Sequence, residues 1–365
     1  MEEIKKTIIL TLTQNCNLSC TYCFEHNKSL KTMDYETAIR IIKNEYDSIN
    51  QDEMLEVDFF GGEPFLEFEL IKAIVTYIEN NGMSDRILFF VDTNGTLLDD
   101  SKKDWLIEHR DNFVCGLSYD GNEWMQDINR CGSSKLIDLE FFNEYYPFQT
   151  VKMTVSTETL PKLSDGIIYL EQKGFEVACN LAYGIDWENE ENSVYLQREL
   201  SKLIDYYLEN PNIVPCSLLN KDITGVTLNG GVKRRFCGAK HNVVAYDVDG
   251  REYPCQLFMP LSVGKEKADK SKNLTFFEDI VPDEMLDEKC KKCVIKSICP
   301  TCYGSNYLQY DDIYMQDENY CRLQKIIMKA QAYFWGLKWK LKKLDMSKEE
   351  EHILLDSILA IQKNL

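Results

Sequence analysis

The chain has 365 residues, of which 44% are hydrophobic and 28% are charged, and its formal net charge at pH 7 is −19. This length exceeds the size at which single cores usually divide, so we expect one large domain and a smaller one. The acidic balance excludes a general nucleic-acid surface, which needs clustered Lys and Arg. A membrane span and a secretion signal are also excluded, because the sequence contains no long apolar run. We therefore expect a cytoplasmic protein.

In the first half of the chain, short apolar runs alternate with helical patterns, which predicts β/α units. Strands are expected at 7–13, 55–60, 87–93, 113–118, 150–156 and 176–184. Helices are expected between them at 35–50, 67–81, 101–110, 135–146 and 160–173. Such a string implies a parallel sheet with crossover helices, and both an open doubly wound sheet and a curved partial barrel fit it. In either fold the site lies at the carboxyl ends of the strands.

The pattern changes after a further helix expected at 193–209. Residues 213–321 are rich in Cys and Gly and poor in long periodic segments, and they include a hairpin whose turn is Asp249-Gly250. Such a segment makes little apolar core, so we expect metal centres to hold it together. Two helices, at 322–343 and 347–363, end the chain. The expected domains are 1–212, 213–321 and 322–365.

The charge is unevenly distributed along the chain. Residues 322–345 carry seven Lys or Arg against one Asp, on an amphipathic helical pattern, although the whole chain is strongly acidic. This pattern indicates either a solvated helix face or a docking surface for an acidic peptide or partner.

Fourteen cysteines are the unusual feature of the composition. A cytosolic chain keeps its thiols reduced, so clustered cysteines there more often bind metal than form disulfides. Cys16, Cys20 and Cys23 follow the first expected strand in CxxxCxxC spacing. Three thiolates can hold three irons of a cubane cluster and leave the fourth iron open, whereas iron–sulfur clusters normally take four cysteines. A zinc site completed by a fourth group, such as the nearby His26, is the alternative.

Three further motifs follow the next expected strands. They are GGEP at residues 61–64, TNG at 93–95 and DG at 120–121. Because parallel strands end at the same edge, we expect these motifs to converge with the cysteines on one rim. Taken alone, GGEP is first of all a turn.

Together, the cysteine motif with Tyr22 before its last cysteine and GGEP after the second strand resemble the signature of the radical S-adenosylmethionine enzymes. That family implies a partial (β/α)6 TIM-like barrel and a [4Fe-4S] cluster on Cys16, Cys20 and Cys23. It also implies that the methionine part of the cofactor chelates the open iron. One electron then splits the sulfonium and yields a 5′-deoxyadenosyl radical, which abstracts hydrogen from a C–H bond. The implied cofactor-binding residues are Tyr22, Gly61, Gly62, Glu63, Pro64 and Ser118.

Within this set, Gly61, Gly62 and Glu63 are expected at the cofactor's amino group, and Ser118 near its ribose or carboxylate. Residues 126–130, QDINR, resemble an HDxxR stretch of a larger subgroup of the family, with Gln126 where His is common. For Asp127 and Arg130, a structural ion pair and a role in the site both remain open.

A second array of seven cysteines resembles the SPASM extension, which carries up to two further iron–sulfur clusters. By that resemblance one cluster, nearer the active site, is bound by Cys237, Cys255 and Cys302, with Cys216 as the candidate fourth ligand. If Cys216 is not bound, the open iron could hold a substrate thiolate. The distal cluster is bound by Cys290, Cys293, Cys299 and Cys321. The two residues between Cys299 and Cys302 are one fewer than is usual in that family.

Two simpler interpretations apply to the remaining cysteines of the chain. A zinc ribbon is the alternative for residues 290–302, but its CxxC pairs are usually separated by about 15 to 20 residues. Cys115, Cys131 and Cys179 are expected to be small buried hydrophobic residues, with Cys131 in a loop.

Enzymes with this arrangement mostly modify peptides or proteins, so a ribosomal precursor peptide or protein is the expected substrate, with thioether, carbon–carbon or related linkages as products. Sulfatase-maturing members typically have Asp after the cysteine corresponding to Cys255. Here that residue is Gln256, which cannot act as a base, so formylglycine formation is the second hypothesis. A non-catalytic electron carrier or metal-stabilised scaffold is the third. No catalytic acid or base can be assigned.

We also expect an electron donor such as flavodoxin or ferredoxin. Because Cys16 lies too near the start for an N-terminal leader-binding module, we expect leader recognition by a separate protein or by the barrel. Neither a nucleic acid nor a membrane is expected as a partner.

Overall fold

The computed structural model describes residues 4–365, and its contacts divide the chain into two compact units. The first unit takes the chain up to Lys152 together with Gly238–Phe276, and the second takes Met153–Cys237 together with Phe277–Leu365. Both units are therefore discontinuous in sequence, and they cut across the expected segments 1–212, 213–321 and 322–365. Those three segments remain a prediction about domains.

The first unit is built on a six-stranded sheet in the order β4-β3-β2-β1-β8-β9. Four parallel strands follow the expected pattern: β1 (Ile4–Thr13), β2 (Met54–Gly61), β3 (Ile87–Thr93) and β4 (Phe113–Leu117). Alternate residues of β2 and β3 are buried, and Phe59, Phe89 and Phe113 stack on neighbouring strands with ring centroids 5.6 to 6.1 Å apart. This aromatic stack occupies one face of the sheet and forms part of the core of the unit.

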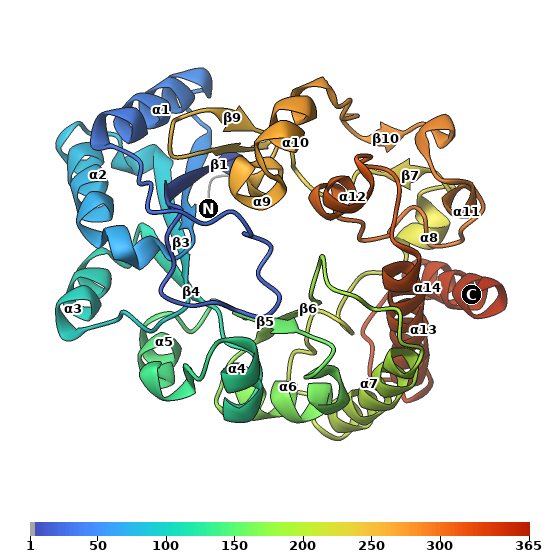
Figure 1. Ribbon diagram of the computed structural model, residues 1–365. Helices are drawn as coiled ribbons and strands as arrows, with labels where there is room; N and C mark the ends of the chain where they lie inside the picture. The colour runs from blue at the N-terminus through green and yellow to red at the C-terminus, as the bar shows by residue number, and fades with distance from the viewer. Residues whose placement is uncertain (1–3) are drawn as a thin grey trace. The chain divides into compact units, whose positions relative to one another are not determined.

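Helices follow each of these strands and pack along one face of the sheet (Figure 1). They are α1 (Tyr35–Ser48), α2 (Phe68–Asn80), α3 (Asp100–His109), α4 (Glu123–Asn129) and α5 (Leu139–Tyr145). The first three match the expected helices. In place of one helix at 135–146, the chain makes a short 3-10 turn, and α5 then begins after its cap Asp138. The sequence did not predict α4, because its seven residues are too few for a clear periodicity.

The expected hairpin around Asp249-Gly250 forms and adds two strands to the first unit. β8 (Val243–Tyr246) pairs in parallel with β1, and β9 (Glu252–Tyr253) returns antiparallel to β8. Gly250 has φ +75°, and a Cβ there would lie 2.8 Å from Thr37 on α1. Glycine is therefore required at this turn for both reasons. Two short helices complete the segment, α9 (Pro260–Val263) and α10 (Lys265–Lys270).

The strand succession continues beyond β4 in chain order. Ser118 forms a parallel bridge with Lys152 at the start of β5 (Val151–Val155), and β5 pairs with β6 (Val177–Leu181). In a doubly wound sheet the strand order reverses at a switch point, whereas here β1 to β6 succeed one another. The expected α/β class with a partial (β/α)6 barrel is confirmed.

The second unit is mainly helical. Its long helices are α6 (Leu163–Gln172), α7 (Glu191–Glu209), α13 (Glu318–Lys340) and α14 (Lys348–Asn364), close to the expected positions. Its short elements are α8 (Gly225–Leu228), α11 (Glu288–Lys291), α12 (Tyr303–Tyr310) and the antiparallel pair β7 (Lys233–Arg234) and β10 (Ile280–Val281). Asp317 caps α13 by accepting the Tyr320 amide at 2.6 Å, so this helix begins four residues before 322 and includes Cys321.

The C-terminal helices share a core with the cysteine-rich segment of the same unit. Met328 and Ala332 of α13 and Leu354 and Ile358 of α14 pack with Ile295, which lies between the cysteines. A capping box between Ser347 and Glu350 fixes the start of α14. Within residues 4–365, no helix has both the length and the apolar character needed to cross a bilayer.

Candidate active site and cluster sites

The loop between β1 and α1 carries Cys16, Cys20 and Cys23, all half-buried. The pKa of Cys20 is raised to about 11, chiefly by burial; Arg130 opposes the rise, and the thiols of Cys23 and Cys16 contribute to it. The three sulfurs are thus within electrostatic reach of one another. Iron binds the thiolate, so bound iron would have to overcome this burial.

Lys28, which the sequence motifs did not identify, lies beside these thiols. Lys28 donates to the Leu18 carbonyl at 3.4 Å, and the thiols of Cys16 and Cys23 raise its pKa against the effect of burial. The sequence offered only one signal for it, its position five residues after the motif. Its ammonium can offset the negative charge of thiolates on this loop.

The two glycines of GGEP are required by close backbone contact with the cysteine loop. The Gly62 amide donates to the Thr13 carbonyl at 3.1 Å, and the Glu63 amide donates to the Asn15 carbonyl at 2.9 Å. Cβ atoms at Gly61 and Gly62 would lie 2.2 Å from those same carbonyl oxygens, and one at Gly62 would also lie 2.9 Å from Cys16 Cβ. Only glycine permits this approach. The motif therefore joins the end of β2 directly to the cysteine loop.

Glu63 is 1% exposed and connects the second strand end to the third. Its Oε1 accepts from the Thr93 hydroxyl at 2.7 Å and from the Phe65 amide at 3.1 Å, and its Oε2 accepts from the Asn94 amide at 2.9 Å. Burial raises the pKa of Glu63, and these bonds oppose the rise. Since a carboxylate oxygen can accept two bonds, Oε2 can accept one more donor.

The TNG turn also contacts the cysteine loop directly. Asn94 donates to the side chain of Asn17 at 2.9 Å, and Asn17 donates to Thr96 at 2.7 Å. Asn17 lies between the first two cysteines of the motif. The ends of β1, β2 and β3 are therefore linked by hydrogen bonds around Glu63, which is the convergence that the sequence predicted.

Asp120, after β4, is the centre of a buried network that sequence reasoning missed. It is 0% exposed and accepts from Arg130 Nε at 3.0 Å, from the Tyr22 hydroxyl at 2.5 Å and from Asn129 at 3.2 Å. Arg130 also lies over the Tyr22 ring, 5.6 Å from its centroid. The DG motif was the only sequence signal for Asp120. Through Tyr22, this network ties the cysteine loop to the end of β4.

The QDINR segment is the last four residues of α4 and the residue after it. Arg130 pairs with Asp120, whereas Asp127 accepts the Ser134 amide at 2.9 Å and so closes the turn after α4. Gln126, where the subgroup commonly has His, is 0% exposed, and both the oxygen and the nitrogen of its side-chain amide form hydrogen bonds. Its Oε1 accepts the Asp120 amide at 2.8 Å and its Nε2 donates to Ser133 at 2.9 Å. Gln126 therefore supports the Asp120 network.

The remaining two expected cofactor residues lie on this same rim. Pro64 is buried at the start of the short 3-10 turn that follows Glu63. Ser118 is half-buried at the end of β4, where its amide donates to the Thr93 carbonyl at 3.0 Å. Their roles toward a cofactor remain a prediction.

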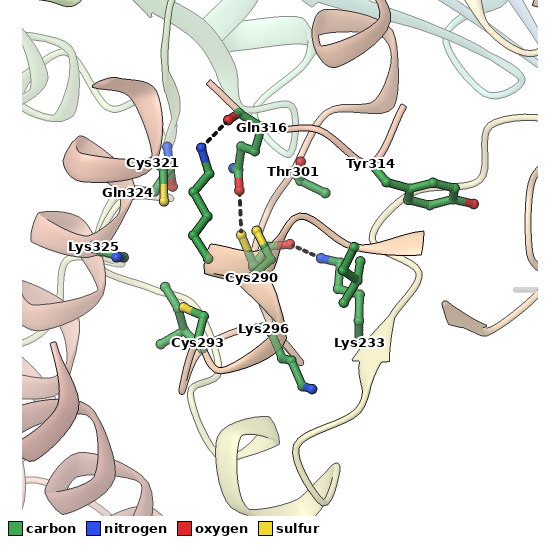
Figure 2. Close-up of a pocket in the computed structure, with 14 residues that line it drawn as sticks. Lys233, Cys290, Cys293, Lys296, Thr301, Tyr314, Gln316, Cys321, Gln324 and Lys325 are labelled. Atoms are coloured by element: carbon green, nitrogen blue, oxygen red, sulfur yellow. Dashed lines mark hydrogen bonds between the residues drawn. The ribbon is translucent and has the colours of Figure 1, made fainter. Parts of the chain in front are cut away.

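The second unit contains a cavity of about 30 Å³ lined by Cys290, Cys293, Cys299 and Cys321 (Figure 2). These are the four cysteines that the resemblance groups together. Burial raises the pKa of Cys290 to about 11, and the other three thiols raise it further. Four thiols spread around one cavity suit a cluster, which takes each ligand on a different iron. No three His, Cys, Asp or Glu side chains of residues 4–365 close around a single metal ion.

Cationic side chains surround this cavity. Lys233 is 5% exposed and donates to the Cys299 carbonyl at 2.8 Å, and Lys289 donates to the Gln316 carbonyl at 2.7 Å. Gln316 in turn accepts from the Cys299 thiol at 3.7 Å (Figure 2). Lys296 and Lys325 complete the basic lining. The lysines can offset the negative charge that four thiolates would bring into a buried site.

Of the other expected cluster ligands, Cys302 and Cys237 lie near each other in the second unit. Burial raises the pKa of Cys302 to about 11, and the Cys237 thiol raises it further. Burial raises the pKa of Tyr183, and both thiols also raise it. The Tyr183 ring packs at a tilt against the Tyr320 ring, with centroids 5.1 Å apart. Cys255 belongs to the first unit, directly after β9.

Cys216, the candidate fourth ligand, is 1% exposed, and its amide donates to the Tyr207 hydroxyl at 2.9 Å. Burial raises the pKa of its thiol to about 11, with Tyr207 opposing the rise and Glu171 adding to it. Its role as a ligand remains a prediction.

Apart from Cys216, the three cysteines outside the two arrays differ in their exposure to solvent. Cys115 and Cys179 are 0% and 1% exposed, which confirms the expectation that they are buried. For Cys131 that expectation is wrong, because this residue is exposed on the turn after α4 with φ +58°. Its thiol donates to the Ser19 carbonyl at 3.1 Å, so it borders the cysteine loop.

The chain is similar to known proteins in sequence and in fold. A 4Fe-4S single cluster domain matches residues 7–135. The cysteine-type anaerobic sulfatase-maturating enzyme of Clostridium perfringens is 26% identical over 363 residues, which cover 87% of this chain and 94% of that protein. An uncharacterised protein of Methanocaldococcus jannaschii, MJ0907, is 35% identical over 176 residues; the match covers 45% of this chain and 58% of that protein.

Two solved structures share the fold. Native anSMEcpe with bound AdoMet and Cp18Cys peptide has a TM-score of 0.68 at 20% identity, covering 92% of this chain and 99% of that one. Streptococcus suis SuiB bound to precursor peptide SuiA has a TM-score of 0.55 at 15% identity, covering 87% and 76%. Both matches extend past the barrel into the cysteine-rich C-terminal part.

The relatives with named activities are enzymes, which leaves the non-catalytic carrier or scaffold without support. S-adenosylmethionine and [4Fe-4S] clusters are the cofactors that the cluster-domain match and these relatives support. With two cysteine arrays and the GGEP rim in place, the chain is a radical S-adenosylmethionine enzyme whose C-terminal extension is of the SPASM type.

Proposed function

We propose that this enzyme modifies a ribosomal precursor peptide or protein after abstracting a hydrogen atom from it. The observation that carries the proposal is the single rim in which the cysteine loop, the GGEP turn and the TNG turn are hydrogen-bonded around buried Glu63. Four cysteines of the second array line a cavity of their own, which supports an enzyme of the multi-cluster kind.

At the first site, Cys16, Cys20 and Cys23 would hold the cluster. When S-adenosylmethionine is bound there and one electron is supplied, it provides a 5′-deoxyadenosyl radical for hydrogen abstraction. Among residues 4–365, Glu63 Oε2 accepts from the Asn94 amide alone, so it can receive an ammonium donor of the cofactor. Gly61, Gly62 and Pro64 hold Glu63 in place against the cysteine loop, and Ser118 and Tyr22 border the site from β4 and from the loop.

For the auxiliary clusters, we assign Cys290, Cys293, Cys299 and Cys321 to one cluster, and Cys237, Cys255 and Cys302 to the other. The second set lacks a fourth thiolate. Cys216 is the candidate, and if it keeps its place beside Tyr207, the remaining iron is open to a thiolate of the substrate.

A peptide substrate is supported by two relatives of the same fold, which carry peptides in their solved structures. Turnover also requires a one-electron donor such as flavodoxin or ferredoxin, and we propose that a separate protein or the barrel recognises a leader. We infer a cytosolic location, because free thiols persist in a reducing compartment.

Formylglycine formation is the second candidate, favoured by the similarity to the Clostridium perfringens enzyme over 94% of its length. The residue after Cys255 weakens it. Gln256 has an amide side chain, which cannot take a proton from a substrate as an Asp could. This candidate therefore needs a base elsewhere in the chain.

The test uses the anaerobically reconstituted enzyme with dithionite, S-adenosylmethionine and the product of any short open reading frame found adjacent to its gene. We expect release of 5′-deoxyadenosine and a peptide product that has lost two hydrogen atoms, both abolished by Cys20→Ala. Conversion of a Cys or Ser of a sulfatase peptide to an aldehyde would establish the second candidate instead. No release of 5′-deoxyadenosine with any reductant rejects both.

A further inference from the structure

We propose that the groove between α7 and α13 is the docking site of a small acidic one-electron carrier protein that reduces the cluster on Cys290, Cys293, Cys299 and Cys321. This inference rests on the proposed function for the presence of that cluster. It adds the surface at which the electron donor docks and the cluster that the donor reduces.

The groove encloses about 1040 Å³ and is the largest of the cavities described in the second unit. Arg322, Lys325, Lys329 and Tyr333 of α13 line one side at spacings of three and four residues, as one helix face requires. The opposite side is α7, where exposed Gln197 and partly exposed Ser193 are polar. Tyr333 is 54% exposed and gives the groove an aromatic contact of the kind enriched in protein interfaces.

The groove is basic although the chain is strongly acidic. Four cationic side chains line it, Lys289 and the three from α13, against two carboxylate side chains, Glu188 and Glu318. Of the four, Lys289 is paired with Asp287 at 3.5 Å, so the excess positive charge comes from α13. Arg322 donates to the carbonyls of Trp187 and Glu188, which leaves its full charge uncompensated. Within residues 4–365, neither Lys325 nor Lys329 forms a salt bridge. Charge complementarity therefore favours an acidic partner and repels basic ones.

The position of the groove favours a redox protein over an acidic leader peptide. Lys289, Cys321 and Lys325 line both the groove and the cavity of the four cysteines. In Figure 2, Cys321 and Lys325 lie on the α13 side of that cavity, away from Lys233. A protein seated in the groove thus contacts residues that also line the cluster site. A leader peptide would gain nothing from this proximity, whereas electron transfer depends on it.

The step itself is a simple exchange of one electron. The reduced carrier is oxidised by one electron, the cluster on the four cysteines gains that electron, and no bond is made or broken. The carrier is the only co-reactant required.

The experiment compares two matched charge reversals on the same helix of the holoenzyme. Lys329→Glu lies in the groove, and Lys340→Glu lies on exposed helix surface outside it. A third variant, Gln197→Glu with Lys329→Glu, adds negative charge on the α7 side. Binding of an acidic flavodoxin is measured by calorimetry at two ionic strengths. Formation of 5′-deoxyadenosine is measured with reduced flavodoxin and with reduced methyl viologen, a small cation that needs no docking site.

We expect Lys329→Glu to weaken flavodoxin binding about tenfold at low salt and to flatten its salt dependence, the double variant to weaken it further, and Lys340→Glu to leave it unchanged. Viologen-driven turnover should be equal in all variants. Equal flavodoxin binding by Lys329→Glu and wild type, or equal losses in both reversals, overturns the proposal. Retained flavodoxin binding with lost affinity for an acidic leader peptide also overturns it. If viologen drives no turnover in the wild type, the proposed function fails, while the binding comparison still decides the docking site.

Discussion

Backbone contact explains why glycine is needed where the second strand meets the cysteine loop. At Gly62 the Asn15 carbonyl lies where a side chain would begin, so any other residue must push the cysteine loop away from β2. The same contact carries the two amide bonds that join the motifs. The positions of the cysteines and of Glu63 therefore depend on the absence of a side chain at Gly62.

We predict that Gly62→Ala lowers the iron bound at the first site to less than about half, because displacing Asn15 also displaces Cys16. Iron and sulfide per chain after anaerobic reconstitution measure the effect. The matched control is Gly336→Ala on α13, where a new Cβ meets only ordinary contacts at 3.9 Å and the change should be neutral or stabilising by up to about 1 kcal/mol. Full iron binding by Gly62→Ala would contradict this account of GGEP.

Charge pairing matters most at Asp120, which lies beside the site with no exposure to solvent. Arg130 is its cationic partner and contacts both carboxylate oxygens, and Tyr22 and Asn129 also donate to Oδ2. A buried ion pair of this kind is costly to break because the remaining charge is left in a site of low polarity.

We predict that Arg130→Met lowers the free energy of unfolding by about 3 to 5 kcal/mol, since Asp120 is then buried without its partner. The double variant Asp120→Asn with Arg130→Met should recover part of this loss. Urea unfolding followed by circular dichroism, without clusters, measures both. The exposed pair of Arg234 and Asp279 is the control, and Arg234→Met should cost about 1 kcal/mol or less. A small effect of Arg130→Met would show that Asp120 is not buried as described.

Among the elements, the contact of α6 with α7 contains a carboxyl group whose protonation is coupled to folding. Burial raises the pKa of Glu171 from 4.5 to about 7, although the Tyr207 hydroxyl donates to it at 2.5 Å. Its Oε2 is buried without a hydrogen-bond partner. The folded state therefore holds this proton more tightly than the unfolded state does.

We predict that local stability of α6 and α7 falls as pH rises from about 4.5 to about 7, because Glu171 must ionise in a buried place. The loss, on the order of 2 kcal/mol, should be absent in Glu171→Gln. Hydrogen exchange of α6 and α7 amides at pH 5.5 and 8, corrected for intrinsic rates, measures it. The control Glu209→Gln, on the exposed end of α7, should behave as wild type. Identical pH responses of wild type and Glu171→Gln would refute the coupling.

At the scale of the whole molecule, the two units are stabilised by different means. The first has a six-stranded sheet with a continuous apolar core. In the second, residues 277–317 form only elements of two to eight residues around the cavity of four cysteines. Of this segment, Ile295 is buried in the core shared by α13 and α14, and partly buried Cys293, Val294 and Ile298 pack against that core. Segments of this kind depend on metal for their stability.

We predict that removal of iron with a chelator under anaerobic conditions loosens residues 283–317 far more than β1 to β4. Hydrogen exchange before and after chelation measures the change for each segment, and proteolysis should cut first within 283–317. Helix α14 serves as an internal control, because it carries no cysteine and packs on the apolar side chains of Met328 and Ala332. A uniform loss of protection across both units would contradict this division of stability.

Local signals in the sequence determined the β/α succession, the cysteine spacings and the GGEP turn. Hydrophobic periodicity and turn chemistry act between residues close in the chain, so these features can be read without a structure. The confirmed helices and the Asp249-Gly250 hairpin belong to this class. The short helix α4 and the split of the helix expected at 135–146 do not, because seven residues give too little periodicity.

The tertiary structure decided which groups meet across long distances in the chain. Nothing local shows that Asp120 pairs with Arg130 rather than Arg130 with Asp127, that Gln126 supports that pair, or that Cys131 is exposed. The same holds for the hairpin of residues 243–253, which adds to the sheet of β1, and for the groove that α13 shares with α7. Burial, charge compensation and strand pairing are properties of neighbours in space, and those neighbours are chosen only when the chain has packed.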